Sequence, residues 1–518
     1  MNNIPNLCIG DVSPNGQVSI LDEDRLSYSV LNNSKGAVGI RTISKSLLNE
    51  FIGYIIEHPD NTPTEVRNEL CGRTKIDKFE YGYASTLCIM AQMAISKRNA
   101  YRTDKSNENQ NRLSPDDISY ISAIKTKPFV ILGGFSGTGK SQKVKELAFA
   151  TCPNNSHLRT SETAPGNYLL LSVKPNWHDA TEITGFRSSV NRNYYVTDFM
   201  RFLIKAMHFP NVPFFVCLDE MNLAPVEEYF TDFLSVIESR KKTSSGQIVT
   251  DAIIPASVFN EEYNDNFCIF DCLGFERMDR GMTDDGLHET LLGKFIRIDL
   301  INKIKRDGLT IPSNVIIIGT VNMDDTTNSF SRKVIDRAMT FETVVGKFGD
   351  EYFNSDVALN YVKNPLNGEL FLSDEVRATQ MIDEGRFILT KEEQTKILNF
   401  INDINEDLDG SPFKISYRIL NETILLYRSK KRIAEIMKDE DGLADGVEFK
   451  TDLNTIFDDI LMQKVLPRIE GDYEKCSKCL NKLSSRADNN DWKKSYDKIE
   501  FMIKRFGSDR SGFTSFWN

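Results

Sequence analysis

The residues of this chain with the clearest chemical purpose lie between Gly134 and Ser141. They read GFSGTGKS, a complete GxxxxGK[ST] pattern, between an apolar strand-like run and a helical run. Glycines let the backbone curl so that its N–H groups point at phosphate oxygens, and the helix that follows favours negative charge at its start. We expect these residues to bind the phosphates of a nucleotide: Gly134, Ser136, Gly137, Thr138, Gly139, Lys140 and Ser141. Lys140 would reach the β- and γ-phosphates, and the Ser141 hydroxyl would be a ligand of Mg²⁺.

A pair of carboxylates follows a second apolar run, FFVCL, further along the chain. Asp219 and Glu220 stand at the end of this run. A buried strand delivers its last residues to the carboxyl edge of a parallel sheet, where a phosphate-binding loop also lies. We expect Asp219 to hold Mg²⁺ through water and Glu220 to polarise the attacking water, a contribution of roughly 10²–10⁴-fold in rate.

Three further residues complete the candidate catalytic set. Asn322 ends the apolar run VIIIGTVN, where its amide would orient the attacking water; the plainer interpretation is an asparagine in a strand-end turn. Arg332 and Arg337 follow in SRKVIDRA, on a predicted helix, where a surface salt bridge is the plainer role for either arginine.

The elements that position these residues alternate between strands and helices from about residue 116 to 345. Strand-like runs at 128–132, 168–173, 214–218 and 315–320 are separated by helical patterns. Such alternation predicts an α/β fold, a parallel sheet flanked by helices. An insertion of irregular or β-hairpin structure is expected near 243–290.

The rest of the chain divides on either side of this core. Residues 1–101 predict a small accessory domain, α+β or mostly helical, for target or partner binding, and 102–115 a polar linker. Residues 346–518 predict a helical lid and C-terminal helical region. In the run from Lys391 to Leu408, the expected buried face holds Ile397, Leu398, Ile401, Ile404 and Leu408.

Taken together, these motifs resemble the McrB branch of the AAA+ proteins, the dynein-related and MoxR-like group. The resemblance covers roughly residues 125–345 and rests on LDEMNLAPVEEYFTDFLSVIESR, GTVNMDDTTNSFSRKVIDRA and VKPNWHDATEITGF, with weaker matches at PFKISYRILNE and QKVLPRIEG. It implies a P-loop AAA+ NTPase that assembles into a ring, a hexamer in many relatives. The same likeness implies that Asn322 is a sensor 1 residue and that Arg418 stands where AAA+ lids carry a sensor 2 arginine that contacts nucleotide. It also implies that Arg337 or Arg332, or both, reaches the γ-phosphate bound by a neighbouring copy and stabilises charge in the transition state. A helix-surface role for Arg418 remains the alternative.

The resemblance also implies partners and a setting. McrB-like motors work with a separate McrC-like nuclease subunit in DNA restriction and antiviral defence, and couple hydrolysis to DNA translocation or nuclease activation. We find no nuclease constellation in the chain itself, so cleavage would belong to that partner. Two other functions stay open: a MoxR-like ATPase that remodels a protein complex, and a nucleotide-gated scaffold that does not hydrolyse. The scaffold has no use for the water-activating residues Glu220 and Asn322.

One departure from the McrB pattern bears on the choice of nucleotide. McrB is a GTPase with an MNxxDRS signature, whereas here Thr326 and Thr327 follow Asp325 in place of Arg-Ser. The phosphate loop does not read the base. ATP and GTP therefore both remain candidates, with ATP slightly favoured because most AAA+ proteins use it.

Composition sets broad limits. A net charge of −11 at pH 7 excludes a surface built throughout for nucleic acid, so DNA contact needs a local basic patch or pore. Apolar runs are only of strand length, so no membrane contact is expected. Nine cysteines in 518 residues fit a reducing cytoplasm. In the first domain, Lys75, Lys78, Lys97 and Arg98, with aromatic neighbours, could face DNA, but packing or docking to protein is the favoured interpretation.

Overall fold

The computed structural model describes residues 12–13, 16–21, 25–31, 38–44, 113–159, 161–188, 190, 194–260, 287–289, 295–323, 330–343, 359–439, 451–508 and 512–517. By contact, the chain forms two compact units. The larger one holds residues 111–208, 212–276 and 299–518 and contains every motif singled out above.

The smaller unit contains a four-stranded antiparallel sheet in the order β1-β2-β3-β4. Its strands are β1 (Val12–Ser13), β2 (Gly16–Leu21), β3 (Arg25–Leu31) and β4 (Val38–Ser44). A hairpin of β13 (Leu287–Glu289) and β14 (Phe295–Arg297) also lies largely in this unit. Of the predicted accessory domain, residues 1–101, everything apart from the four strands β1 to β4 lies outside the described residues.

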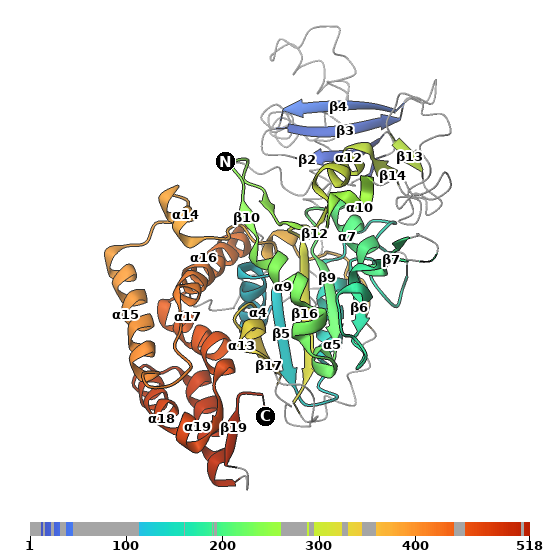
Figure 1. Ribbon diagram of the computed structural model, residues 1–518. Coiled ribbons are helices and arrows are strands. Elements are labelled where there is room, and N and C mark those ends of the chain that lie inside the picture. The colour runs from blue at the N-terminus through green and yellow to red at the C-terminus, as the bar shows by residue number, and fades with distance from the viewer. Residues whose placement is uncertain are drawn as a thin grey trace. The chain divides into compact units, whose positions relative to one another are not determined.

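The larger unit is built on a five-stranded parallel sheet in the order β17-β5-β16-β9-β6 (Figure 1). The strands are β5 (Phe129–Gly134), β6 (Tyr168–Ser172), β9 (Phe214–Asp219), β16 (Val315–Asn322) and β17 (Met339–Thr343). Every residue of β5 is buried, as are the first seven of β16. Continuous apolar runs of this kind are typical of strands covered on both faces.

The fifth strand, β17, was missed from the sequence. Its residues MTFET are half polar, because it is the edge strand and pairs only with β5. Parallel pairing sets Met339 opposite Val130 and Thr343 opposite Gly134. Arg337 therefore lies before the amino end of β17, and the phosphate loop lies beyond the carboxyl end of β5.

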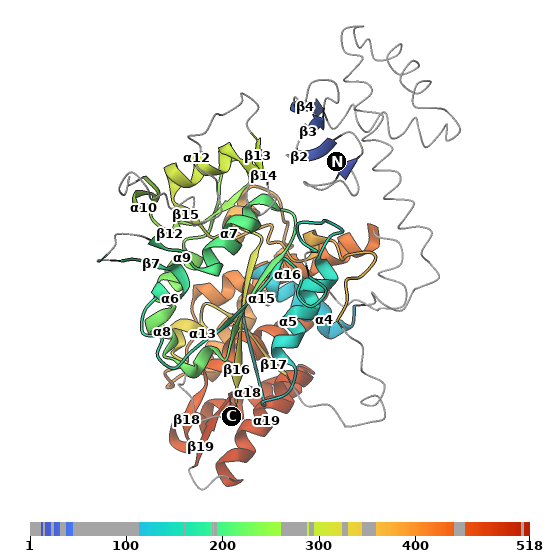
Figure 2. The same cartoon turned by 90° about the vertical axis from the view of Figure 1, so that its right-hand side faces the viewer.

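Helices cover both faces of the sheet. Figure 2 shows α4 (Pro115–Thr126) and α5 (Lys140–Thr151) on one side, with α9 (Thr231–Glu238) and α13 (Arg332–Ile335) on the other. The remaining helices around the sheet are α6 (Thr181–Thr184), α7 (Asp198–His208), α8 (Val226–Tyr229), α10 (Ala256–Asn260) and α12 (Ile298–Asp307). Ser114 caps α4 in a capping box with Asp117, so the end of the predicted linker is already the start of a helix.

Small β elements interrupt the alternation in two places. The hairpin of β7 (Phe186–Arg187) and β8 (Tyr194–Tyr195) precedes α7. The hairpin of β10 (Lys241–Lys242) and β11 (Ile248–Val249) follows α9, and β12 (Ala252–Ile254) pairs with β15 (Leu309–Thr310). A hairpin was among the structures expected near 243–290, and most of that range lies outside the described residues.

The C-terminal region is helical, with one short two-stranded sheet. Its helices are α14 (Ala378–Asp383), α15 (Lys391–Asp407), α16 (Tyr417–Asp439), α17 (Leu453–Ile460), α18 (Tyr473–Asn489) and α19 (Lys493–Ser508). A π-helical turn at Leu461–Val465 continues α17, and β18 (Glu470–Asp472) pairs with β19 (Phe513–Ser515).

The buried face predicted for α15 needs one correction. Ile397, Ile401, Ile404 and Leu408 are buried, but Leu398 is 49% exposed. Phe400 takes the remaining place on the face, because the helical period brings residues three and four apart to the same side.

This helical region packs directly on α4. The buried ammonium of Lys430, on α16, pairs with Asp459 of α17 at 2.5 Å, and Ser119 of α4 donates to the same carboxylate at 3.3 Å. Lys125 of α4 donates to the carbonyls of Glu369 and Leu372. Because these charged groups are buried with partners, breaking one pair costs stability. None of the helices within the described residues is both long and apolar enough to cross a membrane.

The aromatic cluster of the helical region offers a test of this packing. Phe457 is 8% exposed, and its ring stacks on Phe400 at 4.3 Å between centroids. We expect Phe457→Ala to lower the free energy of unfolding by about 3–5 kcal/mol, because it leaves a cavity and removes the stack, and Phe457→Leu to cost less. Thermal and urea unfolding followed by circular dichroism measure both. Equal stability of the alanine variant and the parent would contradict the packing.

Candidate nucleotide site

The phosphate-binding loop connects β5 to α5 at the carboxyl edge of the sheet. Gly137 and Gly139 have φ values of 78° and 76°, in the left-handed region that glycine enters without strain. A Cβ at either position would meet nothing within 4 Å, so the loop needs these glycines for its backbone path. Gly139 caps α5, which places Lys140 and Ser141 in the first helical turn.

Crowding explains the glycine that opens the loop. A Cβ on Gly134 would stand 2.0 Å from Oγ1 of Thr343 and 2.8 Å from its carbonyl oxygen. Thr343 also donates to the carbonyl of Gly133 and lies 3.1 Å from Oγ1 of Thr138. Thr343, the last residue of β17, thus packs against the loop.

The ammonium of Lys140 lies within the loop. It donates to the carbonyls of Gly134 at 2.9 Å and Phe135 at 2.7 Å, and the residue is only 6% exposed. The following residue, Ser141, donates from its hydroxyl to Oδ1 of Asp219. The expected hydroxyl and carboxylate ligands of Mg²⁺ are therefore side by side.

The carboxylates of β9 are held by the neighbouring strand. Oγ1 of Thr320, in β16, donates to Oδ1 of Asp219 at 2.8 Å and accepts the backbone N–H of Glu220 at 3.0 Å. Glu220 has a φ of 53°, a conformation that a residue with a side chain adopts at some cost. The strain turns the Glu220 side chain toward Asn322, whose Nδ2 donates to Oε1 of Glu220 at 3.0 Å.

The structure thus brings together Ser141, Asp219, Glu220 and Asn322 beside the loop. The parallel register explains this, because Asn322 pairs with Gly134 and Gly319 with Leu218. Thr320 and Thr343 were not singled out from the sequence. The signal for Thr320 was a hydroxyl on an otherwise apolar run just before a strand's carboxyl end, where only a polar partner makes a buried hydroxyl tolerable.

Arg337 lies at the opposite, amino edge of the sheet. Since β5 spans six residues, the two edges are about 17 Å apart. Arg337 donates to the carbonyl of Lys333 at 2.8 Å, and its Nε lies 3.8 Å from Oε1 of Glu238. Arg332 lies over the ring of Phe413 and donates to the carbonyl of Pro412 at 2.7 Å.

Arg418 also lies at the amino edge, and its expected contact with nucleotide stays a prediction. Its Nη2 is 2.7 Å from Oε2 of Glu238, the last residue of α9. Glu238 is 3.6 Å from the ammonium of Lys127, which directly follows α4 and precedes β5. The structure therefore places Arg418 with Arg337 rather than at the phosphate loop of its own chain. Helix α16 begins at Tyr417 and packs antiparallel to α4, so its first turn meets the end of α4.

The amino edge is a cluster rich in positive charge. Its basic members are Lys127, Arg332, Arg337, Arg418, Lys464 and Arg468, and its carboxylates are Glu238, Asp336 and Glu422. Burial lowers the pKa of the Arg468 guanidinium, and the nearby charges of Arg332 and Arg418 lower it further against the pull of Asp336. More cations than carboxylates at this edge suit it to an anionic partner.

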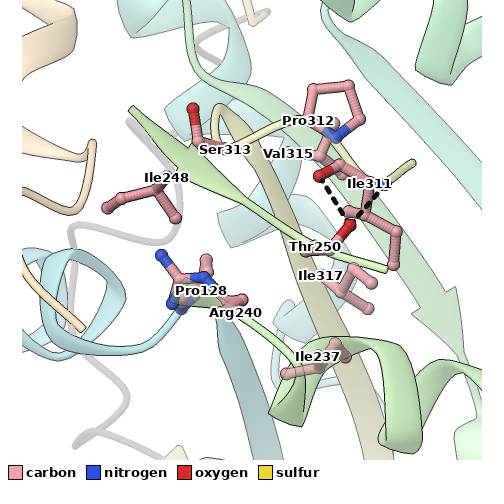
Figure 3. A pocket seen from close by; sticks show the side chains of 10 residues that line it. All are labelled: Pro128, Ile237, Arg240, Ile248, Thr250, Ile311, Pro312, Ser313, Val315 and Ile317. Atoms are coloured by element: carbon pink, nitrogen blue, oxygen red, sulfur yellow. Dashed lines mark hydrogen bonds between the residues drawn. The ribbon is translucent and has the colours of Figure 1, made fainter. Parts of the chain in front are cut away.

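A small cavity of about 20 Å³ also opens at the amino edge, below β11 (Figure 3). Pro128, Val315 and Ile317 line it together with Arg240, whose Nη2 finds no hydrogen-bond partner in the part of the chain that the structure describes. Burial lowers the pKa of Arg240 to about 10. A volume of this size has room for roughly one water molecule, so the cavity is not a nucleotide site.

Cysteines contribute nothing reactive to the described part of the chain. Cys476 and Cys479 are buried in α18 as free thiols, and burial raises the pKa of Cys476 to about 12. A thiol with such a pKa stays protonated near neutrality and is a poor nucleophile. Cys268 and Cys272 lie outside the described residues.

Comparisons with known proteins give few matches. Residues 372–511 match a family described as a domain of unknown function, DUF8727. No curated protein matches the chain. Among solved structures, a protein of Cytophaga hutchinsonii described as a "putative ATPase" is similar at 11% identity, over 67% of this chain and 85% of that one, with a TM-score of 0.33. A likeness this distant carries no argument about function.

The bridging role of Thr320 can be tested directly. We expect Thr320→Val to lower any turnover at this site by about 5- to 150-fold, because Asp219 loses a donor and the Glu220 N–H loses its acceptor, a cost of about 1–3 kcal/mol. Thr320→Ser keeps the hydroxyl and should stay within about threefold of the parent. Steady-state phosphate release from ATP and GTP measures both. A valine variant as active as the serine variant would refute the bridge.

Proposed function

We propose that this chain is a nucleoside triphosphate phosphohydrolase of the AAA+ type. The observation that carries the proposal is the hydrogen-bonded set at the carboxyl edge of the sheet, in which Ser141 contacts Asp219 and Asn322 contacts Glu220 beside the glycine loop. The strand order supports it, because the phosphate loop follows a central strand and the carboxylates follow a strand two places away. A nucleotide-gated scaffold would have no need of a strained Glu220 held by an asparagine.

The residues divide the work by position. Backbone N–H groups of the loop and the ammonium of Lys140 bind the triphosphate, whose negative charge also suits the start of α5. Glu220 accepts a proton from the attacking water, and the amide of Asn322 fixes the direction of that carboxylate. The γ-phosphate is thereby attacked in line with its leaving oxygen.

A Mg²⁺ ion fits the side chains at this point. The Ser141 hydroxyl and the Asp219 carboxylate offer the oxygen ligands that this ion prefers, and they already touch each other. When bound, Mg²⁺ neutralises charge on the phosphate oxygens. Thr320, in β16, holds the Asp219 carboxylate beside Ser141 by donating a hydrogen bond to it.

A complete site requires a second copy of the chain. Arg337 and Arg418 lie beside Glu238 at the amino edge and cannot reach the loop of their own chain across the length of the sheet. A head-to-tail ring brings the amino edge of one copy to the carboxyl edge of the next, so that these arginines meet its γ-phosphate. Arg337, which is least engaged by strong partners, is our first choice for the finger, with Arg332 and Arg418 beside it.

The finer assignment rests on the McrB resemblance of the motifs. We propose a ring motor, a hexamer by that resemblance, in a restriction or antiviral defence system of the cytoplasm. It would act with a McrC-like nuclease subunit and on DNA through the assembly. Candidate nuclease residues were not found in the sequence, so such a partner would carry out cleavage. ATP is favoured over GTP only by the frequency of ATP use among AAA+ proteins.

Phosphate release by the purified protein tests the proposal. We expect ATP or GTP to be hydrolysed, and Glu220→Gln to lose turnover by at least a hundredfold while it still binds nucleotide, because only the base is removed. The matched control is Glu227→Gln, which alters a carboxylate of α8 outside the hydrogen-bonded set. Absence of turnover with either nucleotide, with a McrC-like partner and DNA present, would contradict hydrolysis and favour the scaffold.

A further inference from the structure

The segment QKVLPRIEG was part of the family resemblance, but the proposed chemistry gives it no role. It contains a π-helical turn, Leu461–Val465, and the buried residue Lys464, which is 1% exposed. Such turns interrupt regular helices and are frequent at functional sites. Because a buried lysine is costly unless paired, its contacts show what it is there to hold.

The Lys464 ammonium makes two hydrogen bonds and one ion pair. It donates to the carbonyl of Asp336 at 3.0 Å and to that of Ala338 at 2.7 Å, and it pairs with Oε2 of Glu422 at 2.9 Å. The two carbonyls belong to the residues on either side of Arg337. Lys464 therefore donates hydrogen bonds to the backbone immediately before and after Arg337, the proposed finger.

A second residue of the same segment, Arg468, also contacts Asp336. Nε of Arg468 lies 3.2 Å from Oδ1 of Asp336, and Nη2 of Arg468 donates to the carbonyl of Lys414. Glu422, on α16, is also 2.5 Å from the ammonium of Lys127. Burial alone would raise the pKa of Glu422, but the two lysines hold it below its usual value, so this carboxylate stays ionised beside Lys464.

We propose that Lys464 is a positioning residue for Arg337 and that it couples the C-terminal helical region to the neighbouring subunit's nucleotide. Lys464, Arg468, Glu422 and Arg418 all lie within residues 372–511, the stretch of unknown function. That stretch sets the backbone from which Arg337 extends. A shift of the helical region relative to the sheet moves the finger with it. The inference depends on the proposed hydrolysis across two copies.

The test uses the full-length protein and pairs of variants. Lys464→Met removes the three bonds with little change of volume, and it is made alone and together with Arg337→Ala. Lys430→Met is the matched control, since Lys430 is also a buried, ion-paired lysine of the helical region but its partner is Asp459. Lys464→Gln keeps N–H donors for the two carbonyls without a charge, and it replaces the methionine variant if that fails to fold.

Phosphate release gives the first readout. We expect Lys464→Met to lower kcat tenfold or more with KM changed less than threefold, and to have almost no further effect once Arg337 is alanine. Lys464→Gln should restore part of the rate. Lys430→Met should lower the melting temperature but leave kcat near that of the parent. An equal loss from Lys464→Met with or without Arg337 would overturn the proposal.

Amide hydrogen exchange gives a readout that needs no turnover. The N–H groups of Arg337 and Ala338 are bonded within their own turn, to the carbonyls of Val334 and Ile335. We expect Lys464→Met to speed exchange in a peptide covering 332–339, and Lys430→Met to leave it unchanged. If the parent protein has no turnover, or Arg337→Ala does not affect it, the trans site is wrong, while the exchange rates still decide whether Lys464 positions this turn. Unchanged exchange in Lys464→Met would refute the positioning role.

Discussion

The carboxylate of Asp219 is the point on which the rest of the site depends. It accepts hydrogen bonds from Ser141, at the start of α5, and from Thr320, in β16. One side chain thus joins the phosphate loop to two central strands, and the bond from Thr320 to the Glu220 N–H extends the same network to the water-activating residue. The strained backbone of Glu220 persists because its surroundings over-determine it. The parallel register makes all of this available at a single edge.

The opposite, amino edge of the sheet is rich in positive charge. Its arginines and lysines outnumber its carboxylates, and they come both from the sheet's own connections and from the helical region. Glu238 is shared by Arg337, Arg418 and Lys127, and of these three cations Arg337 lies farthest from it, at 3.8 Å. A chain with an anion-binding edge and a cation-rich edge about one strand length apart is suited to head-to-tail assembly. The rate of hydrolysis would then depend on the contact between copies as well as on nucleotide binding.

Much of the site could be read from the sequence, because its residues follow directly after continuous apolar strands. Glycine spacing around Lys140, the Asp219–Glu220 pair and Asn322 all belong to short motifs whose position in a parallel sheet is fixed by the strand before them. The edge strand β17 was not predicted, because its residues are half polar. Leu398 was assigned to the buried face of α15 by mistake, because two adjacent apolar residues do not show which of them faces solvent. The pairing of Arg418 with Glu238 joins residues far apart in the chain, so only the packing of α16 on α4 reveals it.

The central claim, that two copies build one site, is tested most directly by mixing two inactive variants. Lys140→Ala lacks a working phosphate loop but keeps its arginines, and Arg337→Ala keeps its loop but lacks the finger. Each alone should show little phosphate release. Mixed in equal amounts and allowed to exchange subunits, they should recover a clear fraction of parental turnover, because some contacts pair an intact loop with an intact arginine. A mixture as inactive as its components, with co-assembly shown by crosslinking, would contradict the account.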